Sequence, residues 1–398
     1  AYIEFANQLD TLMTMVLPYM TGHPTRPNVL KLLAAATKTL AHPKRIPPLT
    51  RLVTASHAEY LAEAFDSPMI RGPLSSIPCF LPMDLDGTAW VLVGVGMVHR
   101  IGVSRIRGGT GRLTDSLAAS FQASGGTIRT SAKVEQILVE GQKAVGVRLD
   151  TGEELRAHDV MSACNVKYAL TELLPPDVLG RKESVQAQHI PVAESSASFK
   201  LDIALKGKLQ MSRHQAWRKD SVDLRVPGLC WADDQVHRAA WKACARDQLP
   251  DKLPGFTLIP SAADPSQAPE GQDTLWYWSG VVPTYPTESW DTLKHKAEAK
   301  ANEDFSVYFD EVEDIEIARR VMSPLELEQR FTVPNGHVYH VDMNASRFGA
   351  SRPSPEFAGF RVPSVENLYV SGGGMHPSSG ICGIPGQLAA KTLLRHSK

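Results

Sequence analysis

The C-terminal part of this chain contains two glycine-rich turns between a short apolar stretch and a run of small residues. Residues 368–370 are apolar and lead into three consecutive glycines at 372–374. A second turn with glycines at 380, 383 and 386 follows, and a helix is expected over 387–394. Glycines let backbone N–H groups approach a ligand closely, and a helix N-terminus favours an electron-rich group. This order predicts a site that holds a polar cofactor.

The same tail resembles the C-terminal flavin-binding segment of the phytoene-desaturase-like FAD oxidoreductases, which are relatives of the flavin amine oxidases. The family pattern is matched by Asn367-Leu368-Tyr369, by His376-Pro377 and by Gly383-Ile384-Pro385-Gly386. A second block agrees in order and spacing over residues 107–163, and a weaker third block agrees over residues 322–340. The resemblance therefore extends over residues 100–398.

The resemblance implies an α/β fold of the FAD-linked reductase and amine oxidase type. Such a fold has a discontinuous FAD-binding domain and an α+β substrate domain with a mixed or antiparallel sheet. Residues 1–104 are then the helical part of the substrate domain, and residues 166–335 are the rest of it. Residues 105–165 and 336–398 are the middle and C-terminal segments of the FAD-binding domain.

Hydrophobic periodicity and turn residues predict the individual elements. Helices are expected over 5–19, 29–40, 113–124 and 292–309. Strands are expected over 127–130, 159–162, 197–203 and 274–279, together with a hairpin over 144–155 and a helix or turn near Val134.

The dinucleotide fingerprint of such enzymes is not found in this sequence. In the family, a strand near the N-terminus leads into G-x-G-x-x-G, which holds the FAD pyrophosphate at a helix N-terminus. Gly94 and Gly96 lie in an apolar run, but His99 stands where the third glycine belongs. Too few residues follow for a βαβ unit, which needs about 30. We expect residues 89–98 to form a buried helix or strand.

Three explanations of the missing fingerprint stay open. The segment lies on a second polypeptide, which is either a separate gene product or a cleaved fragment. Alternatively, the chain is truncated. In the third explanation the chain is a degenerate homologue without flavin, which would make it a structural or assembly subunit of the same fold.

Composition excludes several classes of function. The chain is 43% hydrophobic and 21% charged with a net charge of −1, so no nucleic-acid partner is expected. Five cysteines without a C-x-x-C pair argue against a disulfide framework or a metal site and favour a cytoplasmic compartment. No stretch reaches the roughly 18 to 20 apolar residues of a membrane span. The apolar run 89–98 leaves a peripheral membrane contact open.

The resemblance also assigns FAD contacts to particular residues. Val134 lies where the family contacts the adenine through its main chain, and Ala163 lies in a turn that replaces the family's S-N-A-D. The first glycine turn is expected at the pyrophosphate and ribityl chain, and the second along the isoalloxazine ring. The contact residues of these turns are Gly372, Gly373, Gly374, Met375, Gly380, Ile381, Cys382 and Gly383.

His340 and His376 are the candidate catalytic residues. An imidazole can remove a proton near neutral pH, and His376 precedes Pro377 in the glycine-rich tail. His340 alternates with His337 on an apparent strand and is expected to line the substrate cavity. A structural histidine that hydrogen-bonds to backbone is the alternative at both positions.

Two further groups of residues have both a substrate-binding and a structural interpretation. Trp276 and Trp278 share one face of the strand expected there, and aromatic walls suit an apolar substrate, but core packing is the alternative. Arg105 and Arg107 precede two glycines and can bind an anionic group, or pair with a carboxylate.

The function implied by the resemblance is FAD-dependent oxidation of a small molecule that is apolar or an amine. A hydride would leave a C–H bond for flavin N5, and O₂ or a quinone would accept the electrons later. No motif distinguishes C–C from C–N oxidation. An NAD(P)-dependent dehydrogenase is disfavoured because neither a nicotinamide fingerprint nor a Tyr-x-x-x-Lys pair is present.

Overall fold

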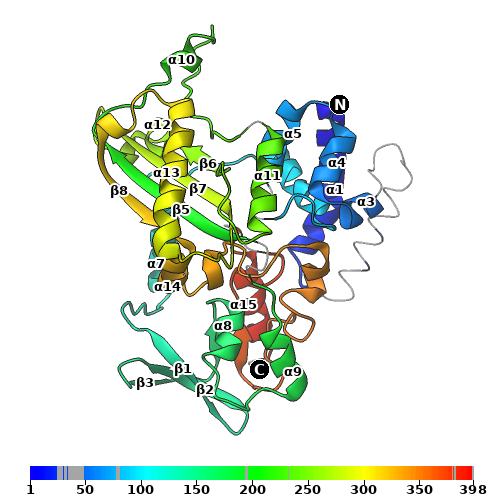
Figure 1. Ribbon diagram of the computed structural model, residues 1–398. Helices are drawn as coiled ribbons and strands as arrows, with labels where there is room; N and C mark the ends of the chain where they lie inside the picture. The colour runs from blue at the N-terminus through cyan, green and yellow to red at the C-terminus, as the bar shows by residue number, and fades with distance from the viewer. Residues whose placement is uncertain are drawn as a thin grey trace.

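The fold comes from a computed structural model, which describes residues 1–24, 30, 34, 49–77, 81–192, 196–231, 233–378, 380 and 382–396. Figure 1 shows a helical lobe formed by the N-terminal part of the chain, a sheet domain beside it, and a lower body beneath both. The helix predicted over 29–40 falls almost wholly outside the described residues.

The helical lobe buries one apolar stripe from each of its main helices. Its elements are α1 (Tyr2–Met20), α3 (Leu49–Thr54), α4 (His57–Ala64), α5 (Pro68–Ser76), the short 3-10 helix η2 (Ala89–Leu92) and α6 (Val93–Ile101). Leu9, Leu61 and Val95 meet in its core. The Ser56 hydroxyl caps α4 by accepting the N–H of Glu59 at 3.2 Å, which satisfies a donor of the first turn.

The apolar run at residues 89–98 is helical. A Cβ at Gly96 would lie 3.0 Å from the Cβ and carbonyl oxygen of Leu9, so the glycine lets α6 approach the α1 backbone closely. The prediction of a buried helix or strand is confirmed as a helix, and Gly96 of its G-x-G serves helix packing. Within the described ranges, no helix is both long and apolar enough to cross a membrane.

The sheet domain is an antiparallel sheet in the order β6-β7-β5-β8. Its strands are β5 (Ala197–Leu205), β6 (Phe256–Leu258), β7 (Asp273–Val282) and β8 (Glu316–Met322). The long helix α13 (Trp290–Tyr308) covers one face, where Phe199 and Leu201 of β5 pack with Ala301 and Phe305 (Figure 1). The strands predicted over 197–203 and 274–279 are confirmed as β5 and β7, and the helix predicted over 292–309 is confirmed as α13.

Shorter elements connect these strands and lead out of the sheet. They are α10 (Ser212–Gln215), α11 (Asp234–Cys244), α12 (Pro260–Ala263), η3 (Pro265–Gln267), η4 (Glu313–Ile315), α14 (Pro324–Phe331), η5 (Pro334–Gly336), η6 (Ala345–Arg347) and η7 (Gly349–Ser351).

The lower body joins segments from distant parts of the chain. An antiparallel meander of β1 (Val134–Glu140), β2 (Lys143–Leu149) and β3 (Glu154–Arg156) precedes β4 (Val160–Ser162). β4 pairs in parallel with β9 (Leu368–Val370), with Val160 opposite Leu368. The helices α8 (Val166–Thr171), α9 (Arg181–Gln188) and α15 (Ile384–His396) complete a core around Ile137, Val370 and Leu388.

Two local predictions in this body are wrong. Residues 127–130 form no strand, and Ile128 remains 43% exposed, because no described strand lies beside it and a strand needs a ladder partner. Val134 begins strand β1 instead of a helix or turn, because residues 134–140 pair with β2.

The helix α7 (Gly111–Ala123) confirms the helix predicted over 113–124, yet none of its residues is buried. Leu117 is 64% exposed and Phe121 52% exposed, and Leu113 precedes them at the same helical spacing. These three residues form what we name the α7 stripe. An amphipathic helix ordinarily packs its apolar stripe against a core. Among the described residues, Leu117 and Phe121 of the α7 stripe have no such cover.

The two glycines of α6 provide a matched test of the α1–α6 packing. In Gly96→Ala the new methyl group meets the Leu9 backbone, so we expect the free energy of unfolding to fall by about 1 kcal/mol despite the better helix propensity of alanine. In the control Gly94→Ala the methyl group lies 3.8 Å from Ile77, and we expect no loss. Urea unfolding monitored by circular dichroism measures both, and equal midpoints would contradict the packing.

Candidate functional site

The first glycine turn begins where the parallel strands β4 and β9 end. The N–H of Ser371 donates to the Ser162 carbonyl at 2.8 Å, so the carboxyl ends of the two strands lie side by side. In parallel sheets, ligands bind just outside the carboxyl ends of strands. The structure thus brings together Ala163 and the turn at 372–375, which the sequence predicts as cofactor contacts.

Two glycines of this turn have no room for a side chain. Gly372 has φ +91°, and a Cβ there would lie 2.7 Å from the Ala163 carbonyl oxygen. A Cβ at Gly374 would lie 2.9 Å from Val166 Cγ1. Glycine at both positions lets the turn pack directly on the segment between β4 and α8. Close packing on Ala163 and Val166 therefore shapes this turn, and we call residues 372–375 together with Ala163 the cradle.

The second glycine turn is open and leads into α15. Gly380 has φ +142° and Gly383 has φ +66°, and a Cβ at either would meet nothing within 4 Å. Cys382 between them is exposed, and Ile381 lies outside the described residues. The first N–H groups of α15 have no partner within the helix. Open glycines before such a helix N-terminus suit an electron-rich group.

A fully buried arginine joins the first turn to the segment after η5. The guanidinium of Arg352 donates to the carbonyls of Gly373 at 3.1 Å and Met375 at 3.2 Å. It also donates to the carbonyls of Tyr339 at 2.9 Å, Val341 at 3.2 Å and Asp342 at 3.4 Å. One side chain therefore satisfies carbonyls of both loops.

Burial lowers the pKa of Arg352 to about 9, and the nearby Asp342 carboxylate opposes that shift. The guanidinium is therefore charged at neutral pH, and charge-assisted hydrogen bonds are stronger than neutral ones. No sequence signal predicts this residue, because its acceptors are backbone carbonyls that every residue carries.

His340 lies in the segment that Arg352 holds. Its backbone has φ +60°, and residues 337–340 form a turn, so the strand predicted there is wrong. Asn165 caps α8 through the N–H of Tyr168 at 3.2 Å, and its amide donates to the His340 carbonyl at 3.1 Å. Burial lowers the pKa of His340, and the charge of Arg352 lowers it further. The ring is thus a neutral base at physiological pH.

His376 is fully buried behind the first turn. Its Nε2 donates to the Tyr19 carbonyl at 3.1 Å, and its ring packs edge-on to the rings of Tyr19 and Phe348. Burial lowers the pKa of His376 to about 4, so it is neutral at physiological pH. These contacts connect the end of α1 with the glycine turn. A catalytic role for His376 stays a prediction.

Val134 is half-buried at the start of β1, opposite Leu149. The meander to which it belongs shares a core with β4 through Ile137 and Val160. Val134 thus lies on a strand that shares a core with β4. Its contact with the adenine stays a prediction.

A cavity of about 980 Å³ lies between the segment 104–113 and the face of the sheet opposite α13. Ile106 and Leu113 form one wall, and Leu258 and Trp276 form another. The N–H of Gly108 donates to the Asp264 carboxylate at 2.6 Å and holds the segment in place. Cavities of about 300 to 1,000 Å³ with apolar walls suit small ligands. Neither His340 nor His376 is among the lining residues.

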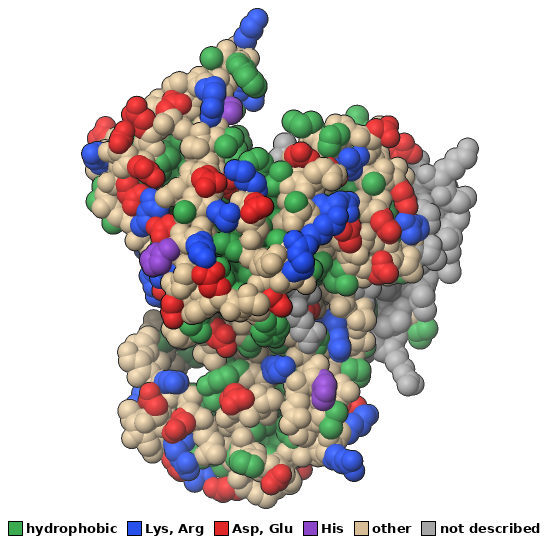
Figure 2. Space-filling model, viewed as in Figure 1, with side chains coloured by type: hydrophobic (Ala, Val, Ile, Leu, Met, Phe, Trp, Pro, Cys, Tyr) green, Lys and Arg blue, Asp and Glu red, His purple; other side chains and the backbone are tan. Residues whose placement is uncertain are grey.

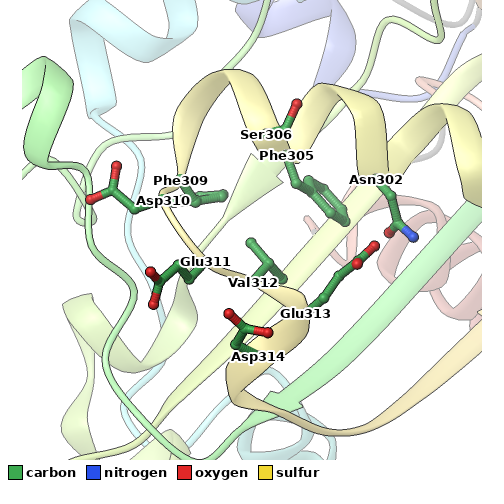
Figure 3. Close-up of a pocket in the computed structure, with 9 residues that line it drawn as sticks. All are labelled: Asn302, Phe305, Ser306, Phe309, Asp310, Glu311, Val312, Glu313 and Asp314. Carbon is green, nitrogen blue, oxygen red and sulfur yellow. The ribbon is translucent and has the colours of Figure 1, made fainter.

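A smaller hollow of about 290 Å³ lies at the C-terminal end of α13 (Figure 3). Four acidic residues line it, and Figure 3 shows their carboxylates pointing in different directions. Asp310 is already used structurally, because its carboxylate accepts the N–H of Ser212 at 3.0 Å. In the part of the chain that the structure describes, no group of three His, Cys, Asp or Glu residues is placed to hold a metal.

Comparison with known proteins shows what this chain is similar to. Residues 85–234 match the flavin-containing amine oxidoreductase family. A mouse protein named pyridine nucleotide-disulfide oxidoreductase domain-containing protein 2 is 27% identical over 93% of this chain and 65% of its own length. A zeta-carotene-forming phytoene desaturase of Myxococcus xanthus is 25% identical over 71% of this chain and 50% of its own length.

Solved structures show the same fold. An oxidoreductase from Methanosarcina mazei has a TM-score of 0.56 at 18% identity, covering 92% of this chain and 72% of its own. A putrescine oxidase bound to putrescine has a TM-score of 0.52 at 13% identity, covering 88% of this chain and 68% of its own. In sequence, the chain is thus similar to phytoene desaturases and to the flavin amine oxidase superfamily. The predicted α/β fold of this superfamily is confirmed.

The superfamily implies a flavin, and the residues of this chain fit one. The glycines of the first turn present backbone where a Cβ would clash with the protein, and those of the second leave open space before a helix N-terminus. Gly372 to Met375 would hold the phosphates, and Gly380, Cys382 and Gly383 would lie along the ring system. The chain spans about 65% of the length of its mouse and rat relatives.

Replacing the buried arginine should loosen both loops together. In Arg352→Met the five carbonyl bonds are lost, and we expect the free energy of unfolding to fall by at least about 3 kcal/mol. Hydrogen exchange should rise at 339–342 and at 373–375. Arg395→Met, at an exposed position of α15, is the control. Faster exchange in only one of the two loops would contradict the joint role of Arg352.

The buried His376 should make the protein sensitive to acid. Its folded pKa of about 4 lies below the ordinary value of 6.5, so unfolding takes up a proton between these pH values. Stability therefore falls as pH drops through that window, by about 1.4 kcal/mol per pH unit for one proton. His376→Gln keeps a donor toward Tyr19 and should take up about one proton fewer at pH 5. Denaturant unfolding at several pH values measures this, with exposed His295→Gln as the control.

Proposed function

We propose that this chain is part of an FAD-dependent oxidoreductase that removes a hydride from a C–H bond of a small molecule. The observation that supports this function is the pairing of a backbone cradle, fixed by Arg352, with an open helix N-terminus. Bound FAD would supply the hydride acceptor. The N-terminus of α15 would favour negative charge on the ring edge beside it.

The cavity over the sheet supports a substrate with an apolar body. Ile106, Leu113, Leu258 and Trp276 provide its apolar walls, and the segment 104–113 lies over the sheet face. The Myxococcus relative is a desaturase that forms zeta-carotene, and the neighbouring solved structure binds putrescine. The apolar walls favour oxidation of the desaturase type. We assign no base to proton removal, because His340, the candidate from the sequence, does not line this cavity.

We further propose that a second segment, which carries the strand and G-x-G-x-x-G, completes the cofactor site. One side of β4 pairs with β9, and the far side of β9 is bridged by Arg361. The far side of β4 carries no strand among the described residues, so a parallel strand can pair there. Parallel sheets are ordinarily covered on both faces. The α7 stripe supplies an apolar surface for the accompanying helix.

The visible spectrum of the purified protein tests this function. We expect the 398-residue chain to retain FAD through desalting only when it is co-expressed with a segment carrying strand-G-x-G-x-x-G. Phe121→Asp places a charge in the α7 stripe and should reduce co-purified segment and bound flavin about tenfold, because burial of a phenylalanine contributes roughly 1.5 to 3 kcal/mol.

Phe331→Asp is the matched control, since Phe331 is 55% exposed and Phe121 is 52% exposed. Unchanged segment binding in Phe121→Asp would contradict docking on the α7 stripe. A complex that forms and stays colourless with added FAD would instead support a flavin-free structural subunit. Bleaching of the flavin spectrum on addition of substrate would then identify compounds that the complex oxidises.

A further inference from the structure

The uncovered face of the sheet presents its side chains in rows across the strands. Asp202 on β5 lies opposite Trp276 on β7 and opposite Arg320 on β8. Directly opposite residues of antiparallel strands lie on the same face, about 4.5 to 5.5 Å apart at Cβ. Lys200 lies two residues before Asp202 and therefore also faces this side. A row of charged residues thus crosses the floor of the cavity.

Both carboxylates in the cavity wall already have partners. The ammonium group of Lys200 donates to Asp202 and forms an ion pair with it. Asp264 accepts the N–H of Gly108 at 2.6 Å and the hydroxyl of Ser266 at 2.8 Å, and these bonds hold the pKa of Asp264 below its usual range. An added cation would therefore compete with bonds that the protein already makes.

Of the three arginines in the wall of the cavity, one is paired with carboxylates of the protein and two are not. Arg319 is held by Glu316 at 2.7 Å and by Glu298 at 3.0 Å. Within the described ranges, Arg105 and Arg320 form no ion pair and no side-chain hydrogen bond. They come from different elements, because Arg105 belongs to the segment above the sheet and Arg320 belongs to the edge strand β8. The cavity wall therefore has guanidinium groups that are available to a ligand, whereas its carboxylates are already paired.

We propose that this cavity binds an amphiphilic acid, a proposal that rests on the function proposed above. Arg105 and Arg320 hold the carboxylate, and the apolar body packs along Trp276 and Leu258. A guanidinium matches a carboxylate with parallel N–H donors, which makes arginine the suited side chain for this task. The acid group fixes the position of the body in the cavity and takes no part in the oxidation.

Direct binding of a fluorescent fatty acid tests the proposal without any need for flavin. The probe is cis-parinaric acid, whose fluorescence rises in an apolar site, with its methyl ester as the uncharged analogue and oleylamine as a cationic competitor. On the 398-residue chain we expect the acid to bind at least about tenfold more tightly than the ester, and oleylamine to displace it poorly.

Variants distinguish the contribution of the acid group to binding from that of the apolar body. Arg105→Met combined with Arg320→Met should raise the Kd of the acid about tenfold and leave the Kd of the ester unchanged. Arg320→Lys keeps a cation and should lose less affinity for the acid than the double variant. Arg246→Met removes an exposed arginine outside the cavity and should change neither Kd. Trp276→Leu should weaken acid and ester alike.

The proposal would be overturned by any one of three results. These are equal affinity for acid and ester, tighter binding of oleylamine than of the acid, and an unchanged Kd of the acid in the double variant. Circular dichroism confirms that each variant is folded, and the single variant Arg320→Lys replaces the double variant if that one does not fold. A chain that binds the acid but retains no FAD even in complex with the co-expressed segment would overturn the oxidoreductase function alone. A protein that retains FAD and shows no preference for the acid over the ester would overturn only the proposal that the cavity binds an amphiphilic acid.

Discussion

The candidate flavin site depends on one buried guanidinium. Two loops, at 339–342 and 373–375, turn backbone carbonyls inward, and a buried carbonyl without a donor destabilises the fold. Arg352 has enough donors in a fixed plane to satisfy both sets at once. Its charge loses hydration, which lowers its pKa, but the carbonyl dipoles replace much of that water. The position of the glycine turn relative to His340 follows from this arrangement.

A second connection joins the helical lobe to the same turn. The last turn of α1 gives its Tyr19 carbonyl to His376, and the Tyr19 ring packs against Phe348 and His376. A Cβ at Gly349 would lie 1.9 Å from the Tyr19 hydroxyl, so only glycine fits beneath the ring. Neutral His376 is part of this contact because a charged ring would have no counter-ion there. This aromatic cluster therefore helps to hold the lobe against the glycine turn.

The sequence predicts those parts whose signal is local. Alternation over 197–203 and 274–279 and the periodicity over 292–309 each describe an element that buries one face, and all three form. The strands expected over 127–130 and 337–340 do not form, because a strand depends on a neighbour that local sequence does not specify. The alternation also places Trp276 and Trp278 on one face. Which of them lines the cavity depends on β6 and the segment 104–113, which come from elsewhere in the chain.

The exposed apolar stripe lies on α7, which precedes the β1–β3 meander in the chain. The substrate half has its own core around Phe199 and Phe305, with α13 over one face of the sheet. The space-filling view shows that charged side chains are interspersed over much of that half (Figure 2). Among the described residues, the edge of β4 away from β9 carries no strand, and Leu117 and Phe121 of the α7 stripe remain exposed. Covering Leu117 and Phe121 would stabilise a complex by roughly 2 to 5 kcal/mol. If the covering segment also holds the FAD phosphates, then flavin and segment each raise the affinity of the other.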